Sequence, residues 1–152
     1  MQLFANSNII LNHIAKNDII ALTYSLKKCH DIDYVKNDND KTLLLTALDY
    51  KNPTVIELIL NNGADTNLCL KTYATPLIYF IKKYLNASLD YIDLRIILML
   101  LRHGADPDIV VNGLQSPREM LRHLQYEIMG IYLTVNSPPL VNKNNDLITI
   151  GY

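Results

Sequence analysis

Apolar residues along this chain gather in short runs that polar turn residues separate. The two clearest runs are Val55–Leu60 and Ile96–Leu101, and a glycine follows each of them, Gly63 and Gly104. Apolar positions at such spacing are typical of helices that bury one face. A glycine just beyond the last apolar residue marks the place where a helix ends in a left-handed conformation. The pattern therefore predicts two helices that stop at these glycines.

A second recurring sequence motif marks the starts of helices. It occurs as Thr42-Leu43-Leu44, as Thr75-Pro76-Leu77 and as Ser116-Pro117-Arg118. Threonine and serine cap helix amino termini with their side-chain oxygen. Proline suits the first helical position, where a missing N–H costs nothing. The sequence thus predicts a helix start at each of the three positions.

The two motifs repeat with a period of 33 residues that an insertion in the third unit lengthens. Thr42 and Thr75 are 33 residues apart, and Thr75 and Ser116 are 41 apart. The segment from Thr42 to Gly63 spans 21 residues and that from Thr75 to Gly104 spans 29, so eight extra residues fall inside the third unit, where we place an insertion at 84–90. Each unit is expected to form a short helix, a tight turn, a second helix and a linker. One such hairpin cannot bury its apolar face alone, so neighbouring units must stack.

We therefore predict an all-α solenoid of about four helix-turn-helix units with short finger linkers. The units are placed at about 8–36, 37–69, 70–110 and 111–135, which together form one domain over residues 1–135. The first unit is degenerate, with a short helix around 10–15 and a second helix starting at Asp18. The last unit, with helices at 117–124 and 126–133, lacks a glycine stop. Residues 136–152, rich in Pro and Asn, are expected to be an irregular C-terminal tail.

These residues resemble the ankyrin repeat, a 33-residue unit with a Thr-Pro-Leu helix start and a Gly-Ala-Asp-x-Asn ending. The second unit matches at Thr42, Ala47 and 63–67, and the third at 75–77 and 104–106. The resemblance covers about residues 8–133. The chain departs from the pattern after Pro-Leu, where the family usually has His and this sequence has Leu45 and Ile78. That departure puts the usual hydrogen bonds at the helix start in doubt and leaves the packing intact.

The Tyr-, Asn- and Ile-rich units and the first helix Thr-Pro-Leu-Ile-Tyr-Phe-Ile at 75–81 resemble the ankyrin proteins of poxviruses. That resemblance implies a protein in the host cytoplasm that binds a host protein and antagonises antiviral or innate defence, or sets host range. Many such proteins carry a C-terminal F-box-like segment that recruits a ubiquitin ligase, and none is seen here. The alternative is a structural or adaptor protein that self-associates as a homo-oligomer or joins a larger assembly, suggested by the poorly polar ends at 9–11 and 128–133.

The ankyrin resemblance also implies where a partner binds, at the fingertips and at the inner ends of the first helices. The fingertips are expected at 34–41, 68–74 and 109–115. The candidate partner-binding residues are Tyr34, Lys36, Asp49, Tyr50, Leu70, Lys71, Tyr73, Lys82, Lys83, Val111 and Asn112. Leu70, Tyr73 and Val111 stand out because linkers that face water are normally polar. They are either hot spots for a partner or residues that pack onto the next finger, and the sequence leaves both open.

Composition and charge argue against nucleic-acid binding, membrane insertion and a disulfide-stabilised fold. The formal net charge is −1, from 14 Lys and Arg against 15 Asp and Glu, so no basic field favours nucleic acid. The longest apolar stretch, 96–101, is too short to cross a bilayer, and residues 1–14 lack the basic start of a signal peptide. Two cysteines are too few for a disulfide framework. We therefore expect an intracellular protein with no membrane or nucleic-acid partner.

No catalytic or metal-binding pattern is found. The four histidines and two cysteines lack the spacing of zinc ligands, and Cys29 and His30 are adjacent. No glycine-rich phosphate loop and no nucleophile with a matching base are suggested. We therefore expect no enzyme activity, catalytic residue, metal or cofactor. Lys82-Lys83 and the pair Arg118 and Arg122 are interpreted as solvated helix faces, with a small patch for an acidic partner as the alternative.

Overall fold

The computed structural model describes residues 2–69, 74–84, 89–111 and 113–122, with side chains from Ser7 onward. Residues 1–121 form one compact unit, and residues 122–152 are a second unit that lies almost wholly outside the described residues. The predicted tail at 136–152 and the predicted last helix at 126–133 therefore lie outside the described residues as well.

The described chain is helical, and its helices follow one another as hairpins. They are α1 (Gln2–Ala15), α2 (Ile19–Lys27), α3 (Leu43–Tyr50), α4 (Pro53–Asn61), α5 (Pro76–Tyr84), α6 (Tyr91–Arg102) and α7 (Pro117–Met120). Over these residues the only extended pairing is an isolated antiparallel bridge between Lys36 and Thr42, at the base of the first finger. The predicted all-α, ankyrin-like repeat fold is confirmed.

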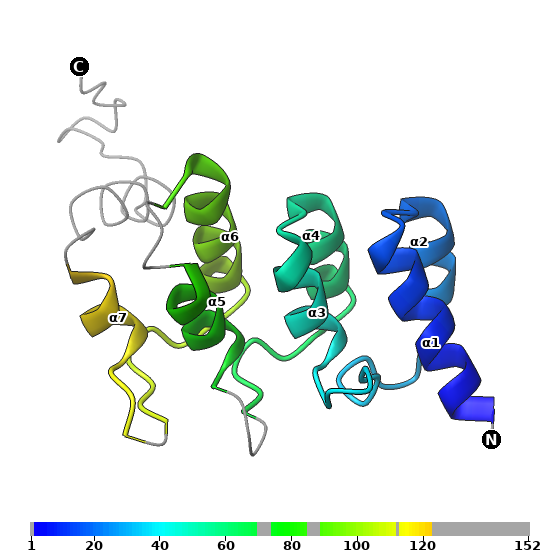
Figure 1. Cartoon of the computed structure of the whole chain (residues 1–152), viewed down its shortest axis with the longest axis horizontal. Helices are drawn as coiled ribbons and strands as arrows, with labels where there is room; N and C mark the ends of the chain where they lie inside the picture. The colour runs from blue at the N-terminus through cyan, green and yellow to red at the C-terminus, as the bar shows by residue number, and fades with distance from the viewer. Residues whose placement is uncertain (1, 70–73, 85–88, 112, 123–152) are drawn as a thin grey trace, which may run out of the picture. The chain divides into compact units, whose positions relative to one another are not determined.

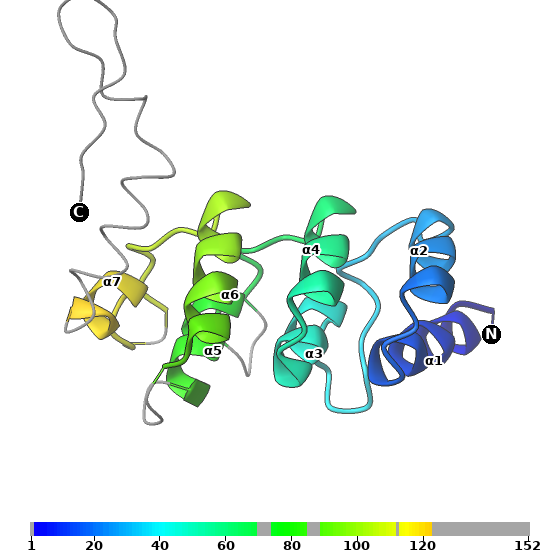
Figure 2. The ribbon, with the colours of Figure 1, turned by 90° about the horizontal axis from the view of Figure 1, so that it is seen from above.

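Within residues 1–121 the helices lie in two rows (Figure 1). The first helix of each unit contacts the first helix of the next, giving the row α1, α3, α5 and α7, and the second helices give the row α2, α4 and α6. Figure 2 shows these two rows side by side. Each unit therefore buries its apolar face against both its own partner helix and the next unit, as a stacked repeat requires.

The helix starts and stops are where the polar signals predict them. The side-chain oxygens of Thr42, Thr75 and Ser116 accept hydrogen bonds from backbone N–H groups three residues on, at 3.3, 3.4 and 3.3 Å. Gly63 and Gly104 follow α4 and α6 with φ of 91° and 90°, a region that L side chains rarely adopt. The Thr and Ser caps and the glycines thus set where these helices begin and end, and with that how equivalent residues of successive units align.

The core runs between the two rows. It is made of aliphatic side chains and Phe80, with Leu22, Leu44, Ile56 and Ile96 among the fully buried residues. Helix α3 is the most deeply buried helix, with every side chain in the segment 43–48 buried. It is enclosed because it contacts α1, α5 and its own partner α4. The middle of the first-helix row is thus the most rigidly held part of the described chain.

Three helix boundaries differ from the predicted ones. Helix α1 begins at Gln2 instead of near residue 10, because the polar residues at 6–8 are weak helix formers that do not break a helix. Helix α6 has 12 residues where α4 has 9, so part of the extra length lies in the helix and not in the turn at 84–90. Helix α7 ends at Met120 and passes into a tighter turn, although the pattern predicts a helix to residue 124.

Candidate functional site

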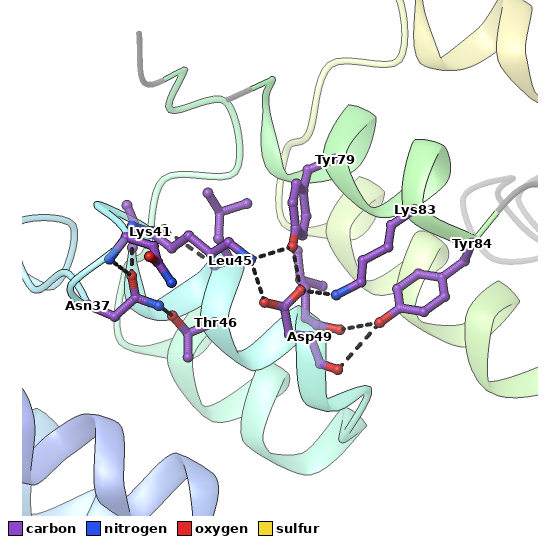
Figure 3. Close-up of polar contacts among 11 residues, drawn as sticks. Asn37, Lys41, Leu45, Thr46, Asp49, Tyr79, Lys83 and Tyr84 are labelled. Atoms are coloured by element: carbon purple, nitrogen blue, oxygen red, sulfur yellow. Dashed lines mark hydrogen bonds and ion pairs between the residues drawn. The ribbon is translucent and has the colours of Figure 1, made fainter. Parts of the chain in front are cut away.

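Asp49, near the end of α3, is the centre of a polar cluster that joins the second and third units (Figure 3). Its carboxylate accepts hydrogen bonds from the ammonium of Lys41, at 2.7 Å, and from Lys83 and the hydroxyl of Tyr79. The Lys41 ammonium also donates to the Tyr79 hydroxyl, at 2.9 Å. Lys41 and Asp49 belong to the second unit, whereas Tyr79 and Lys83 belong to α5. The cluster therefore fixes how the two first helices stack.

The charges in this cluster support one another. Partial burial would raise the pKa of Asp49, but hydrogen bonds from Lys41, Lys83 and Tyr79 outweigh it and hold that pKa below its usual range. Burial would lower the pKa of Lys41, but its bonds to Asp49 and Tyr79 raise it instead. Burial and the bond to Asp49 raise the pKa of the Tyr79 hydroxyl. At neutral pH the cluster thus holds a carboxylate, two ammonium groups and a neutral phenol.

A second ion pair lies beside the first and also bridges two units. Lys51 ends α3 in a left-handed conformation, with φ of 50°. Its ammonium lies 2.6 Å from Oδ1 of Asp93, 3.4 Å from Oδ2 of Asp90 and 4.8 Å from the ring centre of Tyr84. The Oδ1 contact is an ion pair without the alignment of a hydrogen bond, and it raises the pKa of Lys51 against partial burial. Because Asp93 is only 3% exposed, Lys51 supplies the charge that this buried carboxylate needs.

Tyr84 completes the joint between the units. Its hydroxyl donates to the backbone carbonyls of Leu48 and Asp49, at 3.5 and 3.4 Å (Figure 3). Such carbonyls, in the last turn of a helix, have no partner inside the helix itself. The start of the insertion in the third unit is therefore tied to the end of α3.

The predicted contact residues on the first helices lie together but differ in role. Asp49 is committed to the cluster described above, and Lys83 is shared between that cluster and solvent. Tyr50 and Lys82 are exposed, Tyr50 with 53% of its surface. Four of the exposed side chains at or just beyond the carboxyl-terminal ends of α1, α3 and α5 make up what we call the first-helix face, namely Lys16, Tyr50, Lys82 and Lys83.

The predicted fingertip residues are described only in part. Tyr34 is 73% exposed in the first finger, and Lys36 is half-buried and pairs with Asp40 at 3.1 Å. Val111 is half-buried, whereas its neighbour Val110, which the sequence argument passed over, is 63% exposed. Leu70, Lys71, Tyr73 and Asn112 lie outside the described residues. Partner contact by Leu70, Tyr73 and Val111 therefore stays a prediction.

Sequence reasoning missed four members of the joint between the units, namely Lys41, Lys51, Tyr79 and Asp93. One signal was available: Asp90 and Asp93 have the spacing of a capping box, and each accepts the other's backbone N–H, at 2.8 and 3.1 Å. The remaining contacts depend on which residues the stack brings opposite each other. The structure also shows a contact between the third and fourth units, where Arg118 donates two hydrogen bonds of 2.6 and 2.9 Å to Asp108.

Two features of the described residues bear on metal binding and membrane insertion. No group of three or more His, Cys, Asp or Glu side chains in this part of the chain could hold a metal ion. None of the described helices is long and apolar enough to cross a membrane.

Comparison with known proteins supports the repeat resemblance. No family model matches the chain. Over 70 residues it is 34% identical to a putative ankyrin repeat protein of fowlpox virus (strain NVSL). The matched stretch is 46% of this chain but only 9% of the fowlpox protein, so the chain spans a small part of that relative's length. In sequence the chain is therefore similar to part of a poxvirus ankyrin repeat protein, and its fold is an ankyrin-like helical repeat.

Proposed function

We propose that this protein is a protein-interaction module that binds a host protein and antagonises antiviral or innate defence, or sets host range. The similarity to a fowlpox ankyrin repeat protein supports an interaction module and a viral setting. The proposal places the protein in the host cytoplasm, gives it no catalytic residue and requires no cofactor. Imaging of a tagged copy in host cells tests the location.

The observation that carries the proposal is the pair of exposed tyrosines on the predicted contact surface. Tyr34 projects from the first finger, and Tyr50 ends α3 on the first-helix face. Tyrosine supplies a large contact area with few rotatable bonds and is enriched among residues that dominate binding energy. Tyr50 is the last residue of α3, the most deeply buried helix of the described chain, and Tyr34 lies in the finger that leads into α3. A partner would therefore meet anchors that lose little freedom on binding.

The experiment compares capture of host proteins by the full chain and by matched variants. The variant Tyr34→Ser with Tyr50→Ser removes both anchors, while Tyr91→Ser removes an equally exposed tyrosine, 79% exposed, from α6 in the other row. We expect one host protein to be retained by the wild type and by Tyr91→Ser and to be lost from the double variant, with unchanged circular dichroism. Retention of the same protein by the double variant would show that this surface is not the binding site.

Self-association is the second candidate function, and one observation favours it. Helix α2 exposes Ile20, with 86% of its surface accessible, and Tyr24 one turn later. Neighbouring exposed apolar side chains on a helix are typical of contacts between proteins. Light scattering across micromolar concentrations separates the two candidates. A concentration-dependent dimer that Ile20→Ser abolishes would support self-association, and a monomer throughout would exclude it.

A further inference from the structure

The first helices of the first three units contain few acidic residues. Helices α1 and α5 contain no Asp or Glu, and α3 contains only Asp49. Most of the carboxylates in the described residues lie instead in linkers, turns and caps. The first-helix face is therefore a basic surface on a chain whose net charge is −1.

The carboxylates close to this face are all engaged by the chain itself. Asp49 is held by Lys41, Lys83 and Tyr79. Asp18 caps α2 by accepting from the N–H of Ala21, and Asp90 and Asp93 are held by each other's backbone and by Lys51. By contrast, the ammonium groups of Lys16 and Lys82 are exposed and have no partner among the described residues. The charges free to meet a ligand here are thus cationic.

The repeat places these residues in register. Lys16 and Tyr50 each precede a left-handed residue, Asn17 and Lys51 respectively, at the turn that ends a first helix. Tyr50 and Lys83 are 33 residues apart, one repeat period. Lys16, Tyr50 and Lys83 therefore occupy equivalent positions on three adjacent helices, with a tyrosine between two lysines.

The row has a definite length. Packed helices lie about 8–10 Å apart, so Lys16 and the adjacent Lys82 and Lys83 at the end of α5 are separated by roughly 16–20 Å. An extended peptide advances about 3.3 Å per residue, so five to six residues span this distance. A ligand that fits the row would carry carboxylates at its two ends and an apolar side chain midway, over Tyr50.

We propose that the first-helix face binds an acidic, extended segment of the partner protein, with two carboxylates about six residues apart. The inference rests on the proposed interaction function and names the chemistry of the partner. It reverses the interpretation of Lys82 and Lys83 as a merely solvated face. Nucleic acid is the less favoured ligand because a chain with a net charge of −1 offers no extended basic field for a phosphate backbone.

The test uses a fluorescein-labelled ten-residue peptide of Gly and Ser with Glu at positions 2 and 8 and Leu at position 5. Binding to the full chain is measured by fluorescence anisotropy at 50 and 500 mM NaCl. Comparison ligands are the same peptide with Lys for Glu, the same peptide with both Glu residues adjacent, and a ten-nucleotide single-stranded DNA. We expect the peptide with Glu at positions 2 and 8, the spaced Glu peptide, to bind most tightly. Its affinity should fall at 500 mM NaCl, because salt screens the attraction between charges.

Matched variants place the site. Lys16→Glu with Lys82→Glu reverses the two free charges, while Lys27→Glu reverses an exposed lysine at the end of α2, in the other row. The double variant should bind the spaced Glu peptide at least tenfold more weakly than the wild type does. The Lys27→Glu variant should change the affinity for this peptide by less than twofold. Equal binding of the Glu and Lys peptides, tighter binding of DNA, or no loss in the double variant would each overturn the inference.

The experiments distinguish a failure of the acidic-segment inference from a failure of the proposed interaction function. If the wild type and the Lys16→Glu and Lys82→Glu variant capture the same host protein equally well, the acidic-segment inference fails and the interaction function stands. If the spaced Glu peptide binds as expected but no host protein is captured, the interaction function fails while the charge chemistry of the face stands.

Discussion

Replacing Asp49 by Asn tests whether the polar cluster stabilises the stack. The amide keeps the shape of the carboxylate but loses its charge and one of its two acceptor oxygens, of which Oδ2 binds Lys41 and Oδ1 binds Lys83 and Tyr79. A hydrogen bond to a charged group contributes about 1.5–3 kcal/mol when it is well buried, and an exposed ion pair about 0–1 kcal/mol. The Asp49 side chain is 24% exposed and its lysine partners 19% and 40%, which places the cluster between these limits. We expect Asp49→Asn to lower the free energy of unfolding by about 1–2 kcal/mol.

The pH dependence supplies a second signature. Because the folded pKa of Asp49 lies below that of an unfolded Asp, near 3.9, the carboxylate stabilises the fold above about pH 4. This stabilisation is lost as the pH falls through the folded pKa. The difference in unfolding free energy between wild type and Asp49→Asn should therefore be full at pH 7, shrink below about pH 4.5 and vanish at the lowest pH at which the protein still folds.

Urea unfolding followed by circular dichroism at 222 nm measures both effects. Asp38→Asn, which removes an exposed carboxylate in the first finger, is the matched control and should change stability by less than about 0.5 kcal/mol. A thermal midpoint roughly 3–8 °C lower is expected for Asp49→Asn. Equal stability of Asp49→Asn and wild type at pH 7, or a difference that persists unchanged at pH 3, would refute the assignment.

Other substitutions test other parts of the fold. Gly63→Ala should destabilise the protein by about 1–2 kcal/mol in urea unfolding, through the backbone alone, because an added Cβ meets nothing within 4 Å; an unchanged midpoint would contradict the left-handed stop. Lys51→Met should cost about 2–3 kcal/mol by leaving buried Asp93 without its counterion, and adding Asp93→Asn should restore part of that loss; a double variant less stable than the single one would argue against the pairing. Ser116→Ala should cost about 1 kcal/mol through the lost cap, seen as a lower thermal midpoint, whereas a midpoint equal to that of the wild type would show that the cap is not needed.

The sequence predicted the features that depend on local chemistry. The caps at Thr42, Thr75 and Ser116 and the glycine stops at 63 and 104 involve residues only a few positions apart, so their spacing is sufficient evidence. The core residues could also be predicted, because helical periodicity shows which face of each helix is apolar. The repetition of the hairpin then predicted a stacked array, because one hairpin cannot bury its apolar face without a neighbouring unit.

The contacts between units could not be predicted in the same way. The bonds from Tyr79 and Lys83 to Asp49 span 30 and 34 residues and depend on how α5 stacks on α3. Lys51 was overlooked because lysine rarely adopts the left-handed conformation that directs it here. In the third finger, Val110 and not Val111 is the more exposed valine, because consecutive side chains in an extended segment point to opposite sides.

Photo-crosslinking inside host cells tests the central claim most directly, namely that the first-helix face binds a host protein. A photoreactive phenylalanine analogue replaces Tyr50 in one version of the full chain and Tyr91 in another. Both positions are exposed, but they lie in different rows of helices. The account predicts a light-dependent adduct with one host protein from position 50 and none from position 91. An adduct from position 91 alone, or from neither position, would contradict it.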